Sequence, residues 1–61
     1  MTEQEIKTYF SETPVYKFDG TVEDLHTMMV SLGIGYNYLI DQYQIYVAPQ
    51  GEINDSRAVL I

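Results

Sequence analysis

TVEDLHTMMVSL, residues Thr21–Leu32, has the pattern of an amphipathic helix against which the rest of the chain can pack. Thr21 is a good N-cap, because its hydroxyl can accept a hydrogen bond from a free backbone N–H of the first turn. Glu23 and Asp24 then place negative charge at the positive end of the helix dipole, and Thr21-x-x-Asp24 is a near relative of the capping box. Steps of three and four place the apolar side chains on one face: Val22, Leu25, Met28, Met29 and Leu32.

Turn signals bound this helix on both sides. Gly33 is typical of a helix that ends in a left-handed residue, and Ile34 can fold back onto the last turn. Upstream, Val15–Phe18 alternates as a short strand, and Asp19-Gly20 is a turn signal that leads from it to the cap.

A second, shorter helix is predicted over residues 2–10. Thr2-x-x-Glu5 is a capping box in which each side chain can satisfy the other residue's backbone donor. Pro14 disfavours helix in the residue before it, so the segment 11–14 should end this helix. The apolar residues at helical spacing are Ile6, Tyr9 and Phe10.

YNYLIDQYQIYV, residues Tyr36–Val47, predicts a hairpin. Its apolar side chains occupy even positions up to Ile40 and odd positions after Gln42, so the alternation changes phase at Asp41-Gln42. A two-residue loop explains this change, although Asp-Gln is a poor primed turn, and a bulge or a longer loop is the alternative. The predicted pairs share one face: Ile40 with Tyr43, Tyr38 with Ile45, and Tyr36 with Val47.

The opposite hairpin face is mostly polar, so we expect the sheet to be partly open on that side. It carries Asn37, Leu39, Gln44 and Tyr46, and Tyr46 is the predicted exposed anchor on it. Residues 48–56 read as a turn-rich connection, and residues 57–61 as a final strand.

These elements predict an α+β fold in the order α-β-α-β-β-β. We expect a small antiparallel or mixed sheet of three to four strands, with one or two helices packed on one face. The 61 residues form a single domain, 1–61, that buries only about 60% of the surface of its unfolded chain. There is no cysteine to add disulfides, and no strand has a lysine-rich or proline-rich edge. Oligomerisation is the remaining usual way to stabilise such a chain, alongside good packing, and the unprotected strand edge leads us to expect a homodimer.

The sequence contains no membrane or export signal. Its longest apolar run is the four residues Ala58–Ile61, far short of the roughly 20 residues of a membrane span. The start, MTEQEIK, lacks the basic and apolar parts of a signal peptide. We therefore expect a cytoplasmic protein, in the host cytoplasm if it is phage-encoded.

Acidity is the main compositional feature. The net charge is −6, from nine acids against Lys7, Lys17 and Arg57. Three cations are too few to follow a phosphate backbone, so direct nucleic-acid binding is disfavoured. The acids serve solubility, or they match a basic partner by placing carboxylates where a nucleic acid has phosphates.

No motif predicts catalysis, a cofactor or a metal. His26 has Glu23 three residues earlier on the same helix, which favours a surface ion pair over an active site. The acids Asp19, Glu23 and Asp24 match the helix dipole better than any cation loop. We therefore expect a protein that is not an enzyme.

The sequence favours a non-enzymatic binding protein that occupies a partner's surface. In size, acidity and lack of catalytic groups it resembles small phage-encoded inhibitors of host or defence enzymes, such as anti-restriction, anti-CRISPR and uracil-glycosylase inhibitors. The alternative is a structural or regulatory dimerisation module without an inhibitory target. The predicted partner-binding residues are Asp19, Glu23, Asp24, Asp41, Tyr46, Glu52 and Asp55.

Overall fold

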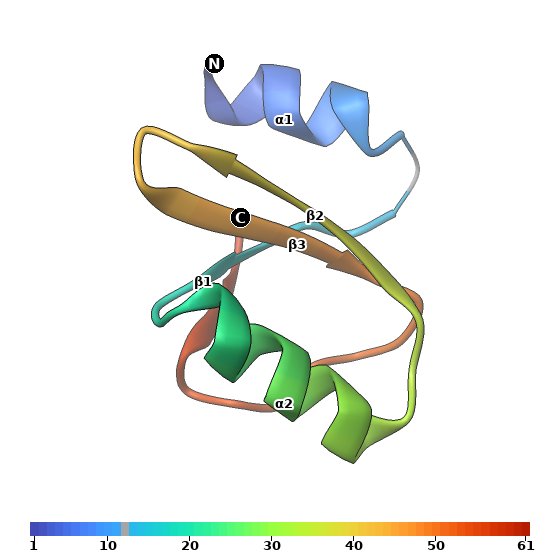
Figure 1. Ribbon diagram of the computed structural model, residues 1–61. Coiled ribbons are helices and arrows are strands. Elements are labelled where there is room, and N and C mark those ends of the chain that lie inside the picture. Colours follow the sequence, from blue (N-terminus) through green and yellow to red (C-terminus); the bar gives the residue numbers. More distant parts are fainter. Residues whose placement is uncertain (12) are drawn as a thin grey trace.

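A four-stranded antiparallel sheet lies between two helices in the computed structural model, which describes residues 1–11 and 13–61 (Figure 1). The strand order is β2-β3-β1-β4, and every neighbouring pair is antiparallel. This confirms the predicted α+β class and element order. The elements are α1 (Glu3–Tyr9), β1 (Tyr16–Phe18), α2 (Val22–Leu32), β2 (Tyr36–Asp41), β3 (Gln44–Pro49) and β4 (Ala58–Leu60).

Helix α2 has the predicted caps. The Thr21 hydroxyl accepts a hydrogen bond from the backbone N–H of Asp24 at 3.1 Å. Gly33 ends the helix with a φ of 70°, and its N–H donates to the carbonyl of Met29 at 3.0 Å. The apolar face is shorter than predicted, because Leu32 is 45% exposed.

The main core forms between α2 and the sheet. Leu25, Met28 and Met29 of α2 are buried against alternate residues of the two central strands. These strand residues are Tyr16 and Phe18 of β1 and Ile45 and Val47 of β3. Because β1 pairs with β3 in the register Phe18↔Ile45, all four side chains point to the α2 side of the sheet.

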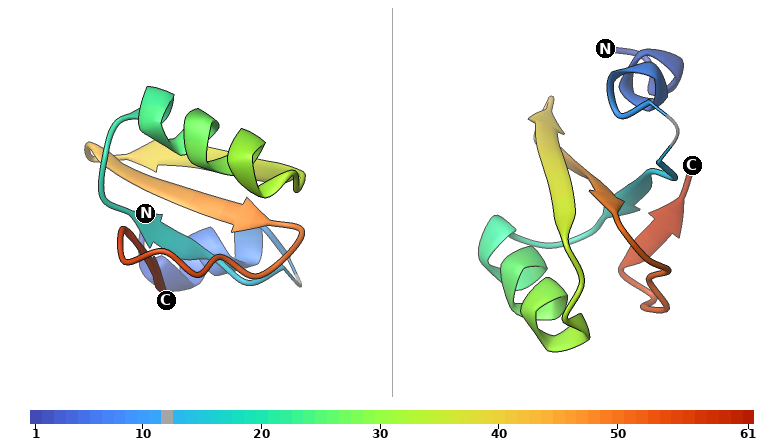
Figure 2. Two further views of the ribbon diagram at one scale, coloured as in Figure 1. Left: turned by 90° about the horizontal axis from the view of Figure 1, so that it is seen from below. Right: turned by 90° about the vertical axis from the view of Figure 1, so that its right-hand side faces the viewer.

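Helix α1 covers the opposite face of the sheet. Its Thr2–Glu5 capping box is present, and Ile6 is buried in a second cluster with Val15 and Tyr46. Both views in Figure 2 place α1 and α2 on opposite sides of the strands. The predicted packing of a helix on one face is that of α2, and α1 in addition covers the hairpin face that was expected to be partly open. The predicted break after α1 includes residue 12, which lies outside the described residues.

The hairpin has the predicted two-residue loop, but one residue further along the chain. The turn is Gln42-Tyr43, and Asp41 pairs with Gln44. The predicted register is therefore wrong by two residues, with Tyr38 opposite Val47 and not Ile45. A shift of two preserves the side-chain faces, which is why the alternation pattern could not detect it.

Strand β3 also runs further than the sequence suggested. Ala48 and Pro49 are buried strand residues and do not belong to the turn-rich connection. The nitrogen of Pro49 faces the β1 side of the strand and has no N–H to donate. This is tolerated because β1 begins at Tyr16, opposite Val47, and so does not reach Pro49. Over 1–11 and 13–61, none of the helices has the length and apolar character needed to cross a membrane.

We expect Thr21→Ala to lower the free energy of unfolding by about 1 kcal/mol, because it leaves an N–H of the first turn of α2 without its acceptor. Urea denaturation followed by circular dichroism measures this loss. Thr27→Ala is the matched control in the middle of the same helix, and it should cost less or stabilise. Equal losses in both variants would contradict the capping role.

We expect the double variant Gln42→Asn/Tyr43→Gly to be more stable by about 1 kcal/mol, because both residues have positive φ and Asn-Gly is the preferred pair for such a turn. Tyr43→Ala, which removes the ring but keeps the left-handed backbone, should give no comparable gain. Denaturant midpoints of the two variants and the unmodified chain test this. A double variant no more stable than Tyr43→Ala would contradict it.

Candidate functional site

His26 is engaged with aromatic side chains and not with a carboxylate. Its Nδ1 is hydrogen-bonded to the hydroxyl of Tyr36, and its ring lies edge-on to that of Tyr38, with 5.4 Å between centroids. No ion pair with Glu23 is present among the described residues, so the predicted pairing is wrong. The described side chains also contain no group of three or more His, Cys, Asp or Glu arranged to hold a metal ion.

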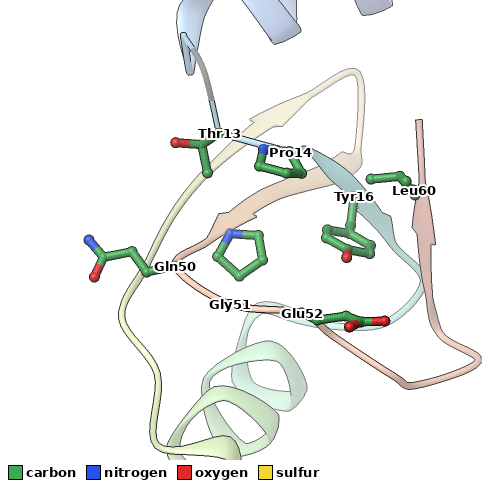
Figure 3. A pocket seen from close by; sticks show the side chains of 8 residues that line it. Thr13, Pro14, Tyr16, Gln50, Gly51, Glu52 and Leu60 are labelled. Atoms are coloured by element: carbon green, nitrogen blue, oxygen red, sulfur yellow. The ribbon is translucent and has the colours of Figure 1, made fainter.

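A depression of about 550 Å³ lies between the start of β1, the end of β3 and β4 (Figure 3). Its apolar walls are Pro14, Tyr16, Pro49 and Leu60. Within residues 1–11 and 13–61, Glu52 is the one carboxylate in the lining, and the imidazole of His26 is not part of it. The described part of the lining is thus mainly apolar, and the groups that could act as acid and base, Glu52 and His26, do not meet in it.

Four of the predicted partner-binding acids gather at one end of the molecule, which we call the acidic end: Asp19, Glu23, Asp24 and Asp55. The backbone N–H of Asp19 donates to the carbonyl of Arg57 at 2.8 Å, which joins the loop after β1 to the start of β4. Asp24, at the start of α2, shares a surface depression with Asp55 and Arg57.

Arg57 is the cation of this end, and it is fully engaged. Its guanidinium bonds both carboxylate oxygens of Asp55, each at 3.1 Å, and lies over the Phe18 ring at 5.4 Å. The hydrogen bonds from Arg57 lower the pKa of Asp55 below its usual value. Asp19, Glu23 and Asp24 form no ion pair within the described ranges, so their charge faces solvent.

The other two predicted acids lie apart from this cluster. Asp41, at the end of β2, accepts a hydrogen bond from the N-terminal ammonium at 3.0 Å, so its charge is compensated within the chain. Glu52 borders the depression in Figure 3, in the connection between β3 and β4. The structure therefore separates six predicted acids into one group of four and two isolated positions.

Tyr46 is not an exposed anchor. Only 8% of its surface is accessible, because it packs under α1 with Ile6 and Val15. The sequence interpretation failed here because it took this face of the sheet as partly open, whereas α1 covers it. Tyr46 belongs to the second core, and its ring is not available to a partner.

Tyr43 is the exposed aromatic residue that the sequence interpretation missed. It is 102% exposed at the tip of the β2–β3 turn and has a φ of 68°, which is unusual for a bulky residue. The turn lies at the same end as the loop after β1, since the Gln44 side chain donates to the Phe18 carbonyl at 3.1 Å. Tyr43 thus lies at the end of the sheet where β1 leads into Asp19, the first residue of the acidic end. The absence of Gly or Asn from the hairpin turn is the sequence signal that could have identified it.

Apolar side chains also gather along β2, the longer edge strand of the sheet. Tyr38 and Ile40 are exposed on the strand itself. Tyr9 of α1 lies in a depression shared with Tyr38, and Val30 lies one turn beyond His26 on α2. We call these four residues, Tyr9, Val30, Tyr38 and Ile40, the β2 edge surface.

We expect Arg57→Gln to raise the pKa of Asp55 toward its ordinary value, because the hydrogen bonds that lower it are lost. A carboxylate with a lowered pKa stabilises the folded state above its unfolded pKa, and this contribution disappears as the pH falls through the folded pKa. Stability near neutral pH should therefore fall in the variant relative to stability in acid. NMR titration of the carboxyl carbons measures the pKa of Asp55, and urea denaturation at neutral and at acidic pH measures the change in stability.

Lys17→Gln is the control for this titration. Lys17 pairs with Glu3 at 2.9 Å, and this hydrogen bond lowers the pKa of Glu3. The variant should move the pKa of Glu3 and leave that of Asp55 unchanged. An Asp55 titration that is the same with and without Arg57 would refute the assigned pairing.

Comparison of the chain with protein-family models, with curated proteins and with solved structures finds no match. The candidate surfaces are therefore those that the geometry distinguishes, namely the acidic end with Tyr43 and the β2 edge surface.

Proposed function

We propose that this chain is a non-enzymatic binding protein that occupies the surface of a partner protein. The observation that carries the proposal is Tyr43. A non-glycine residue in the left-handed region costs about 1 kcal/mol or more, and here the ring buries nothing within the chain. Tyrosine is common at binding hot spots because it buries a large area with few rotatable bonds. Burial of the Tyr43 ring by a partner would explain why the chain keeps a tyrosine in this unfavourable backbone conformation.

The charge beside Tyr43 favours a basic partner. The acidic end carries four carboxylates and Arg57, and Arg57 is already paired with Asp55. Opposite charge on a partner would accelerate association and orient the docking. Enzymes that act on nucleic acids carry basic grooves for phosphates. An inhibitor that fills such a groove is the instance of this class that we favour.

A binding function is also supported by the separation of the polar groups that an enzyme would combine. His26 is bonded to Tyr36 on the α2 face, whereas Glu52 borders the depression near β4. An enzyme that uses His26 stays an alternative, and a His26→Ala variant with unchanged biological activity would dismiss it.

Capture from bacterial lysate by the immobilised chain, at low and high salt, tests the proposal. We expect high salt to weaken capture, because the contact is between opposite charges. Tyr43→Ala should weaken it by about 2 kcal/mol, roughly 30-fold, as expected for a hot-spot aromatic residue. Glu23→Gln/Asp24→Asn should weaken it as well.

Two control variants distinguish a specific loss of partner binding from general damage to the fold. Glu52→Gln removes an acid that lies away from the acidic end, and Val59→Ala trims an exposed side chain on β4, so both should capture normally. Circular dichroism verifies that each variant folds. Capture that is indifferent to salt, to Tyr43→Ala and to the acid variant would refute the proposal.

A dimerisation module is the second candidate function. The observation that favours it is the β2 edge surface, where exposed apolar side chains line a strand edge that no described strand covers. A dimer of this kind is compatible with the first candidate, because Tyr43 and the acidic end lie outside the β2 edge surface.

A further inference from the structure

The free backbone groups of β2 can be assigned from its pairing with β3. The N–H of Gln50 donates to the carbonyl of Gly35 at 2.8 Å, so this pair is of the hydrogen-bonded type. In an antiparallel pair the bonded positions alternate, and residues 35, 37, 39 and 41 therefore face β3. The N–H and C=O groups of Tyr36, Tyr38 and Ile40 consequently point away from the sheet, where none of the described strands lies.

We propose that two copies of this chain pair through their β2 edges, antiparallel across a two-fold axis centred on Tyr38. The proposal rests on the second candidate function and is independent of the first. In a bonded antiparallel pair, both residues must present outward groups, so even-numbered residues must face even-numbered residues. When the axis passes through Tyr38, Tyr38 of one copy pairs with Tyr38 of the other. Tyr36 of each copy then pairs with Ile40 of the other copy. This register uses all three outward residues, whereas one centred on Leu39 uses only Tyr38 and Ile40.

The side chains are compatible with this register. Tyr38 and Ile40 lie on the α2 face, where they would meet Tyr38 and Tyr36 of the second copy, and aromatic pairs stabilise sheets. On the α1 face, Leu39 would lie opposite Asn37, and Asp41 opposite Gly35. No two acids face each other, which matters because each copy carries a net charge of −6.

The charge distribution favours a second copy over a basic partner at this edge. Asp41 is the one acid in β2, and the N-terminal ammonium already compensates it at 3.0 Å. Nothing on β2 therefore attracts a basic surface, unlike the acidic end. Strand β4, at the other edge, has only three residues, and a short edge strand is a poor template for pairing.

Sedimentation velocity over a range of concentrations tests the pairing. We expect the mass to rise from that of one chain to that of two, with weak affinity, because a contact along one strand edge falls at the low end of interface sizes. High salt should strengthen the association by screening the like charges of the two copies. This is opposite to the effect expected for a basic partner, so failure of one proposal is distinguishable from failure of the other.

Ile40→Lys should weaken the association by about tenfold or more, because a charge on an edge strand opposes pairing. Leu60→Lys is the matched control. Leu60 is 59% exposed and Ile40 is 54% exposed, and both lie on the α2 face of an edge strand. The control should associate normally. Equal effects of the two variants, or association that survives Ile40→Lys, would overturn the proposal.

Amide hydrogen exchange of the unmodified chain tests the register without any variant. At high protein concentration, the amides of Tyr36, Tyr38 and Ile40 should become protected, while that of Leu60 should stay unprotected. The amides of Asn37 and Leu39 should be protected at every concentration, since they face β3. A single-chain mass at all concentrations, or a paired chain in which these three amides stay unprotected, would refute the proposal.

Discussion

The packing of α2 on the two central strands is the contact on which the rest of the structure depends. Leu25 and Met29 of the helix lie against Phe18 and Val47 of the sheet, and all four are almost completely removed from water. Burial of each such side chain contributes about 1.5–3 kcal/mol, which is a large share of the stability of a chain this short. The Thr21 cap and the left-handed Gly33 set where the helix starts and ends, and so determine which side chains reach this core.

Helix α1 makes the sheet the middle layer of the molecule. It contributes one buried residue, Ile6, but this suffices to cover Val15 and Tyr46 on the second face. With both faces of the sheet occupied, the exposed apolar side chains of the sheet itself lie on its two edge strands and in the β2–β3 turn. The concentration of exposed tyrosines on the β2 side follows from this arrangement, because β2 is an outer strand and most of β3 is buried.

The two candidate surfaces differ in charge, and this difference is why we propose a different partner for each. The acidic end has uncompensated carboxylates and an outward tyrosine, which suits a basic surface. The β2 edge is nearly neutral and has regularly spaced backbone donors and acceptors, which suit another strand. A strongly acidic chain can associate with itself only where its own acids are absent or compensated, and the bond from the N-terminus to Asp41 provides such a place.

The sequence by itself determined the local structure: both caps, the end of α2 at Gly33, the two-residue hairpin loop and the faces of the strands. These features depend on neighbouring residues and on periodicity. Only the tertiary structure decided the register of the hairpin, because a shift of two leaves the alternation unchanged, and contacts of Asp41 with Met1 and of Gln44 with Phe18 accompany the turn at Gln42-Tyr43. It also decided that Tyr46 is buried and Tyr43 exposed, because whether a strand residue meets a helix or water depends on which face each helix covers. That choice is made by packing between segments far apart in the chain, and no local pattern records it.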